Sequence, residues 1–225
     1  MSDRYPQRRF APPPGATEVV LVRHGASAAA VPGQPFDLLD GHADPALAPE
    51  GVEQARAVAE RLAAEESFSA LYVTPLRRTH ETAAPLAELT GLEPVVAPEL
   101  REVLLGDWEG GELRIRAAQA DPLFFQMLAE ERWDVIPGAE SMDALAERVQ
   151  RGIERIVEET GPDASAVAVL HGGVIGEICR QATASRPFAF VHAENCSVSR
   201  LVVLPGGDRM LLRGFNDVSH LGAAS

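Results

Sequence analysis

The chain has 225 residues, 46% of them hydrophobic, which is enough to bury a sizeable core and is most simply accommodated in one α/β domain. Its formal net charge of −13 disfavours nucleic acid and anionic membranes as partners, because binding to either needs a broad basic face. No apolar run approaches the ~20 residues that span a bilayer. The first residues lack the apolar centre of a secretion signal, so we expect a cytoplasmic protein.

The chain is predicted to open with a tail and a buried strand. Residues 1–16 combine arginines with a proline-rich stretch and are expected to form a flexible tail. The apolar run at 18–22 predicts the first strand. The glycines and prolines of residues 26–48 predict a long loop, and loops of this length are uncommon unless they serve a site.

Helices and strands alternate through the rest of the chain. Apolar periodicity predicts helices over 50–66, 76–89, 112–130 with a break near Pro122, 141–159 and 174–181, and strands over 68–73, 94–96 and 166–170. Ser141 is the expected N-cap of its helix. The segments 198–204 and 210–215 flank a proline and two glycines, which predicts a terminal hairpin. This order predicts an α/β three-layer sandwich with a mainly parallel central sheet, formed as a single domain over residues 17–225.

Two histidines each follow a predicted strand and precede a glycine. Arg23-His24-Gly25 comes directly after the first strand, and His171-Gly172-Gly173 directly after the strand at 166–170. In open α/β folds, ligands bind at the carboxyl ends of the strands. A histidine there can attack an electrophile, an arginine can hold an anion, and a glycine lets a substrate approach the backbone. Taken singly, Arg23 and His24 are better explained as a buried ion pair and a core histidine, and only the further motifs favour a catalytic pair.

Two further strand-end segments supply charged groups. Arg77 and Arg78 open the helix after strand 68–73, where backbone N–H groups and the helix dipole favour an anion. Glu102 follows strand 94–96. Together the segments provide a nucleophile, cationic clamps, a carboxylic acid and glycine-spaced amides, a combination suited to phosphate chemistry.

In these motifs the chain resembles the histidine phosphatase superfamily, also called the phosphoglycerate mutase-like family. The resemblance extends from Val19 to about Phe215. The motifs that carry it, in the family's order, are Leu21-Val22-Arg23-His24-Gly25, Thr74 to Ala83, Leu100-Arg101-Glu102 with Gly106 to Gly110, Pro137 to Ser141, and Val169 to Ile175. The resemblance implies a phosphoglycerate mutase-like fold.

The resemblance also implies roles for five catalytic residues. His24 would be the nucleophile that becomes phosphohistidine, and Glu102 would be the general acid. The phosphoryl oxygens would be held by Arg23, Arg78 and His171. No metal and no cofactor is implied.

Elementary chemistry agrees with these roles. Phosphoryl transfer needs mainly positioning and charge neutralisation, and a neutral imidazole is a competent nucleophile. A backbone carbonyl that accepts from the other ring nitrogen would set the tautomer of His24. Glu102 has to carry a proton when the ester oxygen leaves and then act as a base toward water. We therefore expect hydrolysis to favour mildly acidic pH.

Further residues are expected to contact the substrate. Ser27 keeps a hydroxyl where members of the family commonly have one, and His42 lies in the long loop that borders the substrate. Asn195 resembles a family position near the site, although a structural turn explains it equally well. The predicted substrate-binding set is Arg23, Arg78, His171, Gly172, Ser27, His42 and Asn195.

Three functions compete on this evidence. The leading hypothesis is a metal-independent phosphatase that hydrolyses phosphate monoesters of small metabolites through a phosphohistidine. The second is a phosphoglycerate mutase, but residues 110–137 look short for a mutase lid and carry few cations. The third is a non-catalytic phosphoprotein-binding module, which the retention of all five catalytic-type residues opposes.

The remaining expectations concern cysteines and assembly. Cys179 and Cys196 lack metal-ligand spacing and are expected to be reduced and buried, with a disulfide as the less favoured alternative. The terminal hairpin offers an edge through which a homodimer could form. The sequence does not identify the natural substrate.

Overall fold

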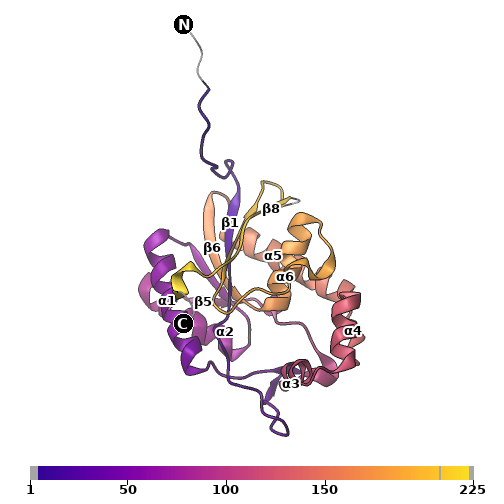
Figure 1. The fold of residues 1–225 in the computed structure, drawn as a ribbon. Helices are drawn as coiled ribbons and strands as arrows, with labels where there is room; N and C mark the ends of the chain where they lie inside the picture. Colours follow the sequence, from indigo (N-terminus) through magenta and orange to yellow (C-terminus); the bar gives the residue numbers. More distant parts are fainter. Residues whose placement is uncertain (1–4, 208, 223–225) are drawn as a thin grey trace.

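The strands assemble into one six-stranded sheet in the order β5-β4-β6-β1-β7-β8 (Figure 1). The computed structural model describes residues 5–207 and 209–222. The strands are β1 (Thr17–Arg23), β4 (Ala70–Val73), β5 (Pro94–Val96), β6 (Ala164–Leu170), β7 (Val198–Val203) and β8 (Met210–Asp217). The first four pair in parallel, whereas β7 is antiparallel to β1 and β8 to β7. The predicted mainly parallel sheet with a terminal hairpin is confirmed.

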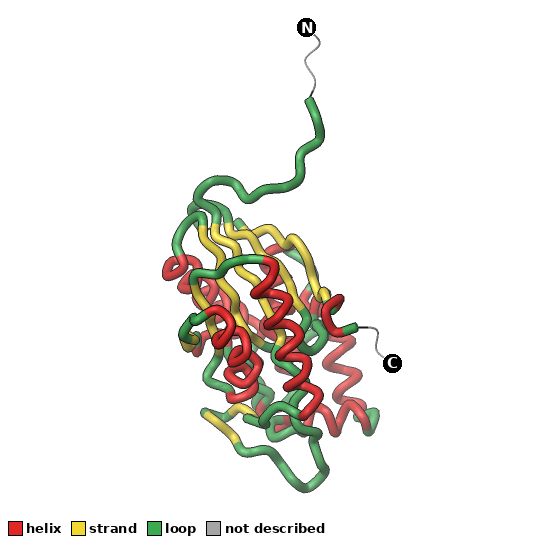
Figure 2. Tube along the Cα trace, turned by 90° about the vertical axis from the view of Figure 1, so that its left-hand side faces the viewer, coloured by secondary structure: helices red, strands yellow, loops and turns green. Residues whose placement is uncertain are grey.

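Helices cover both faces of this sheet (Figures 1 and 2). They are α1 (Pro49–Glu65), α2 (Arg77–Thr90), α3 (Glu112–Ala118), α4 (Pro122–Glu130), α5 (Met142–Thr160) and α6 (Gly172–Thr183). Successive side chains of a strand point to opposite faces. In β1, Val19 and Leu21 accordingly pack in the half of the core that α5 and α6 cover, and Val20 and Val22 in the half that α1 and α2 cover. The predicted three-layer sandwich is confirmed.

Capping residues and glycines set the helix ends. Ser141 accepts a hydrogen bond from Ala144 N at 3.2 Å where α5 begins, as predicted. Gly91 caps the C-terminus of α2 with the left-handed φ of 73° that glycine adopts without strain. The break predicted near Pro122 in the helical segment 112–130 is confirmed: it separates α3 from α4, and Asp121 caps the new helix that starts at Pro122.

Some boundaries differ from the predictions. α6 begins at Gly172, two residues earlier than predicted, and β4 begins at Ala70 rather than 68. The predicted long loop contains a short hairpin of β2 (Leu38–Leu39) and β3 (His42–Ala43). Two-residue strands are too short to produce an alternating pattern, so periodicity could not reveal them.

The part of the predicted tail that the structure describes lies outside the sheet and is mostly exposed. The Phe10 ring lies 3.7 Å from the guanidinium carbon of Arg213 on β8, a cation–π contact. Residues 1–4 of the predicted tail lie outside the described residues. Over the described ranges, no helix has the length and apolar character needed to cross a membrane.

Three parallel strands bring the predicted site residues to one edge of the sheet. Arg23, the last residue of β1, pairs with Leu170 of β6, and Val73 of β4 pairs with Val169 of the same strand. The residues that follow these strand ends therefore lie side by side. They are His24, Thr74 and His171.

Candidate active site

The two strand-end histidines face each other at the carboxyl edge of the sheet. Their ring centroids are 5.3 Å apart and their planes are inclined by 60°. Both side chains are buried, and His24 N donates to Leu170 O at 2.9 Å, which ties the two strand ends together. An anion that contacts one ring at this separation lies within reach of the other.

His24 is held as a neutral ring with a defined tautomer. Its Nδ1 lies 2.8 Å from Gly25 O. Because a carbonyl oxygen only accepts, Nδ1 carries the proton and Nε2 keeps its lone pair. Burial lowers the pKa of His24 well below its usual range, and the nearby charges of Arg78 and Arg23 lower it further. The ring is therefore in the form that a nucleophile needs.

The backbone around His24 is fixed by close contacts. Gly25 N donates to Thr82 Oγ1 at 3.0 Å, and Asn195 Nδ2 donates to His24 O at 2.9 Å. A Cβ added at Gly25 would lie 2.5 Å from Gly51 O, so only glycine fits between β1 and the start of α1. Asn195, predicted to bind substrate, thus has its side-chain amide on the main chain of the nucleophile.

In the described chain, His171 has one ring nitrogen that is hydrogen-bonded and one that is not. Its Nε2 lies 2.9 Å from Thr74 Oγ1, whereas its buried Nδ1 has no hydrogen-bond partner among residues 5–207 and 209–222. Burial, then the charges of Arg78 and His24, lower the pKa of His171 well below its usual range. A neutral ring with one unpartnered nitrogen can hydrogen-bond to a ligand.

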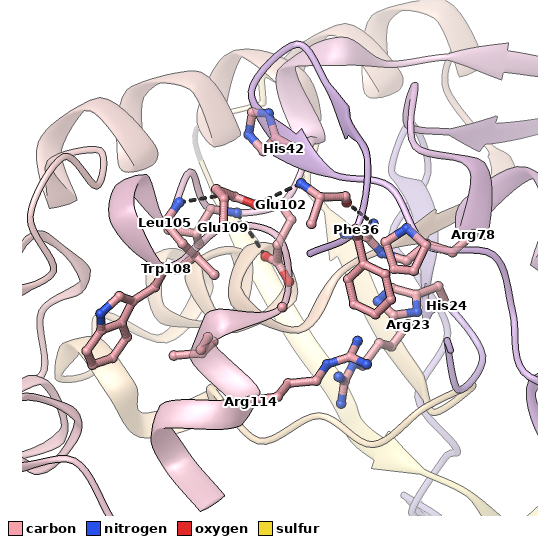
Figure 3. Close-up of a pocket in the computed structure, with 15 residues that line it drawn as sticks. Arg23, His24, Phe36, His42, Arg78, Glu102, Leu105, Trp108, Glu109 and Arg114 are labelled. Carbon is pink, nitrogen blue, oxygen red and sulfur yellow. Dashed lines mark hydrogen bonds between the residues drawn. The ribbon is translucent and has the colours of Figure 1, made fainter. Parts of the chain in front are cut away.

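Arginines concentrate positive charge around this pair. A cavity of about 140 Å³ is lined by residues that include His24, Arg23, Arg78 and Arg114 (Figure 3). Arg78 Nη1 donates to Ala43 O at 2.8 Å, and Arg23 Nη1 donates to Ala193 O at 2.5 Å. Within the described ranges, none of the three arginines has a carboxylate oxygen within 4.0 Å. This acidic chain therefore keeps a local cationic pocket that suits an anion.

Burial affects these arginines without removing their charge. It lowers the pKa of Arg23 and of Arg78, and the carboxylate of Glu102 acts against this in both cases. Arginine nevertheless stays protonated in proteins. Arg23 Nε is buried and without a partner in the part of the chain that the structure describes. An anion would supply the missing acceptor.

Glu102 lines the same cavity, on the loop that follows β5. Its Oε1 accepts from Val103 N at 3.0 Å, and its Oε2 lies 3.5 Å from Gly173 N at the start of α6. A Cβ at Gly173 would lie 2.8 Å from Oε1, so glycine leaves room for this carboxyl group. Glu102 is thereby held beside the histidine pair.

Arg148 of α5 fastens the loop that carries Glu102. Its guanidinium donates to the carbonyl oxygens of Glu99, Arg101 and Glu102 at 2.7–3.0 Å, and it pairs with Glu140 at 2.5 Å. The sequence does not predict a role for Arg148. The apolar periodicity of α5 shows only that Arg148 lies next to the apolar face of the helix, not which groups it contacts. Glu140 lies in the motif Pro137 to Ser141, but nothing in the sequence indicates that Arg148 is its partner.

The other predicted substrate-binding residues surround this centre. His42 lines the cavity, with Nδ1 3.1 Å from Asp40 O, and Ser27 Oγ accepts from Arg114 Nη2 at 2.7 Å. Gly172 lies against the Arg23 side chain and, with Asn195, lines a second cavity. The two cavities share Arg23, Glu102 and Leu113, so every predicted residue lies in or beside one region.

The cavity is also lined by residues for which the sequence predicts no role. Glu109 accepts from Leu105 N and Ala43 N at 2.8 and 2.7 Å, so it joins β3 to the loop after β5 (Figure 3). Phe36 and Arg114 complete the wall. Glu109 belongs to a recognised motif, but nothing in the sequence shows which backbone groups it meets. Arg114 lies in the segment 110–137, whose few cations predict no particular contact.

The described chain has two buried cysteines and no cluster of metal-ligating side chains. Cys179 and Cys196 are free and buried, as predicted, and burial raises the pKa of each thiol to about 12. Such thiols are unreactive near neutral pH. Residues 5–207 and 209–222 contain no group of three or more histidine, cysteine or acidic side chains that could hold a metal ion.

Comparison with known proteins identifies the family. A family model described as histidine phosphatase superfamily (branch 1) matches residues 19–217. The chain belongs to the histidine phosphatase superfamily. This confirms the resemblance that the strand-end motifs carried.

Relatives in this superfamily carry different activities in their names. The chain is 35% identical over 208 residues to phosphoglycerate mutase-like protein 4 of Arabidopsis thaliana, covering 91% of this chain and 86% of that protein. It is 31% identical over 208 residues to the metal-independent phosphoserine phosphatase of the same plant, covering 91% and 83%. Phosphoglycerate mutase from Bacillus anthracis shares the fold, with a TM-score of 0.74 and 22% identity over 92% of this chain and 96% of the other. Family membership alone does not separate phosphatase from mutase.

Proposed function

We propose that this histidine phosphatase superfamily member is a metal-independent phosphatase that hydrolyses phosphate monoesters of small metabolites. The observation that carries the proposal is the neutral His24 ring, whose Nε2 lone pair is free in a cavity shared with Glu102 and with arginines that lack carboxylate partners in the described chain. The similarity to a metal-independent phosphoserine phosphatase supports the same reaction type.

In the first step, His24 Nε2 attacks phosphorus. A P–N bond forms, the P–O ester bond breaks, and the Glu102 carboxyl gives its proton to the leaving oxygen. Arg23 and Arg78 neutralise the charge that spreads over the phosphoryl oxygens. The proton stays on His24 Nδ1, which keeps donating to Gly25 O, and this hydrogen bond stabilises the positive charge that the ring acquires.

His171 is proposed to donate to the same phosphoryl group. When the Thr74 hydroxyl donates to His171 Nε2, the ring proton lies on Nδ1, the buried atom that has no partner in the described residues. A phosphoryl oxygen would accept from it. This gives the second histidine a binding role rather than a nucleophilic one.

In the second step, water replaces the imidazole. The Glu102 carboxylate takes a proton from water, the new O–P bond forms and the P–Nε2 bond breaks. Inorganic phosphate leaves, His24 returns to its neutral form and Glu102 is again protonated. No group outside the chain is needed to balance either step.

The scarcity of unpaired positive charge in the α3–α4 region favours a phosphatase over a mutase. A mutase has to retain a bisphosphorylated intermediate and needs a second strongly cationic pocket. Arg116 is paired with Glu112 and Asp121, and Arg132 with Asp134. Arg114 remains as the cation of this region that faces the cavity. A non-catalytic phosphoprotein-binding module has no need of a free Nε2 beside a carboxyl group.

A panel of phosphorylated metabolites, assayed for release of inorganic phosphate, tests the proposal. We expect hydrolysis of at least one small monoester, and loss of on the order of 10³-fold or more in kcat/KM in His24→Ala. His80→Ala, which removes an exposed histidine outside the cavity, is the matched control. EDTA should have no effect, and vanadate should inhibit.

Other outcomes would overturn the proposal. Hydrolysis that persists in His24→Ala would require another nucleophile. Isomerisation of phosphoglycerate without release of phosphate would identify a mutase. Strong inhibition by EDTA would contradict the metal-independent reaction.

A further inference from the structure

A histidine near the end of the described chain links α1 to the segment that precedes β7. His220 lies on η5 (Ser219–Leu221), a short 3₁₀ helix that follows β8 and packs beside α1 (Figure 1). Its Nε2 lies 3.0 Å from Cys196 O, and its Nδ1 lies 3.1 Å from Arg61 Nη1. The imidazole therefore bridges two segments that are far apart in the sequence.

The two contacts require a neutral ring in a single tautomer. The Cys196 carbonyl oxygen only accepts, so His220 Nε2 carries the proton. The Arg61 guanidinium only donates, so His220 Nδ1 keeps its lone pair. A proton added to Nδ1 would remove this hydrogen bond and place two positive charges against each other.

Arg61 is itself held by other side chains. Its Nη2 donates to Asp217 Oδ2 at 2.6 Å, and its Nε donates to Glu65 Oε1 at 2.8 Å. Its Nη1 also lies 3.3 Å from Ser219 Oγ. The Arg61 guanidinium therefore cannot turn away from His220 without losing its ion pairs.

The turn that contains Cys196 holds the main chain of the nucleophile. Cys196 N donates to Arg23 O at 2.9 Å, and Arg23 N donates to Ser197 O at 3.2 Å. Asn195 Nδ2 donates to His24 O at 2.9 Å. Hydrogen bonds from this turn therefore fix the backbone of both residues that carry the first catalytic motif.

The conformation of Cys196 makes the turn dependent on outside contacts. Cys196 is buried and has a left-handed φ of 51°, which residues other than glycine seldom adopt. Backbone of this kind persists where the surrounding structure holds it. The carbonyl of Cys196 accepts from His220, so His220 is one of the contacts that hold the turn.

We propose that His220 is a positioning residue: by holding the turn that contains Cys196, it keeps the main chain of His24 where attack on phosphorus requires it. The proposal rests on the proposed phosphatase function and deepens it. In the described chain, His220 lines neither of the two cavities that share Arg23, so it would act through the backbone rather than on the substrate. A shift of a catalytic group by about 1 Å costs on the order of 10²-fold in rate. A contact outside the cavity can therefore govern the reaction at His24 Nε2.

Protonation of His220 would release the contact. The charged groups that face its ring come from α1 and from the end of β8, and they are Arg61, Glu65 and Asp217. Burial and the charge of Arg61 lower the pKa of His220, whereas the Cys196 carbonyl and the two carboxylates act against them. The ring is therefore neutral above about pH 7 and takes up a proton only as pH falls below its ordinary pKa of about 6.5. The effect of His220 on the rate should be complete above about pH 7 and lost in acid.

Two substitutions at His220 test the proposal in the full-length chain. His220→Leu removes both hydrogen bonds, whereas the amide of His220→Gln can donate to one partner and accept from the other. With 4-nitrophenyl phosphate at about pH 7.5, we expect His220→Leu to lower kcat by about 10-fold or more and to keep KM within about 3-fold, because Arg78 and His171 lie on other elements. His220→Gln should keep kcat within about 3-fold of the wild type. His80→Leu, at an exposed position, is the matched control.

The same proteins give a second readout across pH. As pH falls toward about 5, the wild type should lose its advantage over His220→Leu, and His220→Gln, which does not titrate, should overtake the wild type. The titrations of Glu102 and His24 are common to all the proteins and cancel in these ratios. A loss of activity caused only by lower stability would grow in acid instead of disappearing. Circular dichroism at each pH verifies that the proteins compared are folded.

Hydrogen exchange measures the same contact without reference to activity. Amide hydrogens in peptides that contain Arg23 and His24 should exchange faster in His220→Leu than in the wild type or in His80→Leu. Peptides that contain His171 should exchange at the wild-type rate. Mass spectrometry of the peptides gives both comparisons in one experiment.

Several results would overturn the proposal. They are wild-type kcat in His220→Leu, a rise in KM alone, equal losses in the Leu and Gln variants at every pH, and unchanged exchange around His24. If no monoester is hydrolysed in a His24-dependent manner, the proposed function itself fails, and the exchange rates alone then show whether His220 holds the backbone of His24.

Discussion

At the scale of single residues, the protonation state of the histidines governs the chemistry. Burial and the nearby arginines keep His24 neutral, and Gly25 O fixes its proton on Nδ1. Under the proposed mechanism, the same arginines would attract the anionic substrate. One set of charges would then both prepare the nucleophile and bind its target, and a chain of net charge −13 could accept a phosphate ester.

The depressed pKa of His24 and that of His171 predict that acid lowers the stability of the fold. In the unfolded chain, both histidines take up protons below their ordinary pKa of about 6.5. In the folded chain they stay neutral to lower pH. As pH falls through about 6.5, the unfolded state thus binds more protons and the free energy of unfolding decreases, until the folded-state pKa is reached.

The melting temperature measured between pH 7 and pH 5 checks this linkage. Each histidine contributes a slope of up to about 1.4 kcal/mol per pH unit, which is roughly 3–6 °C per pH unit for a chain of this size. His24→Gln should flatten the decline, and His80→Gln at an exposed position should keep it. Equal slopes in all three proteins would show that the His24 ring is not held neutral by the fold.

At the scale of elements, the contact between the first loop and α1 positions the nucleophile. A Cβ at Gly51 would lie 2.0 Å from Ala26 O and 2.8 Å from Ala26 N. Ala26 O accepts from Ala48 N at 2.8 Å, so it cannot move without losing that bond. Glycine at the start of α1 therefore allows the backbone after His24 to pass close by.

Gly51→Ala should displace this loop. Overpacking of this kind costs about 1–3 kcal/mol, so we expect a lower free energy of unfolding together with a reduced kcat. The matched control is Gly214→Ala, because a Cβ on this β8 residue meets no atom within 4 Å. Denaturant unfolding and steady-state kinetics measure both effects. Wild-type stability and kcat in Gly51→Ala would refute the role of the contact.

Elements could be predicted from the sequence where a local pattern determines them. The strand ends could be predicted from the apolar run before Arg23-His24 and from the glycines after His171. The proximity of the two histidines then followed, because parallel strands end at a common edge of the sheet. The β2–β3 hairpin was missed because each strand has two residues. Local sequence patterns do not predict contacts between segments that are far apart in the chain.

The supporting residues of the site could not be predicted for that reason. Arg148 acts through carbonyl oxygens 46–49 positions away along the chain, and Glu109 through the backbone of β3. Asn195 contacts the carbonyl of a residue 171 positions away. Every residue has a backbone carbonyl, so the sequence does not indicate which carbonyl a distant side chain contacts.

At the scale of the whole molecule, the fold brings distant segments to one anion-binding centre. His24 follows β1, Arg78 lies on the helix after β4, and His171 follows β6. Glu102 lies on the loop after β5. β8 forms one edge of the sheet, and the homodimer through that edge stays a prediction. Relatives that are 31% and 35% identical carry the names of different activities, so sequence identity does not distinguish phosphatase from mutase. Experiments on the reaction at His24 have to distinguish them.

Trapping the phosphoenzyme tests the central claim most directly. In Glu102→Gln, 4-nitrophenyl phosphate has a leaving group that departs without a proton donor, but water lacks its base, so phosphohistidine should accumulate. After an alkaline quench, which preserves phosphohistidine, peptide mass spectrometry should locate one phosphoryl group on His24, and His24→Ala should lack it. A phosphoryl group on another residue, or none while product still forms, would contradict the account.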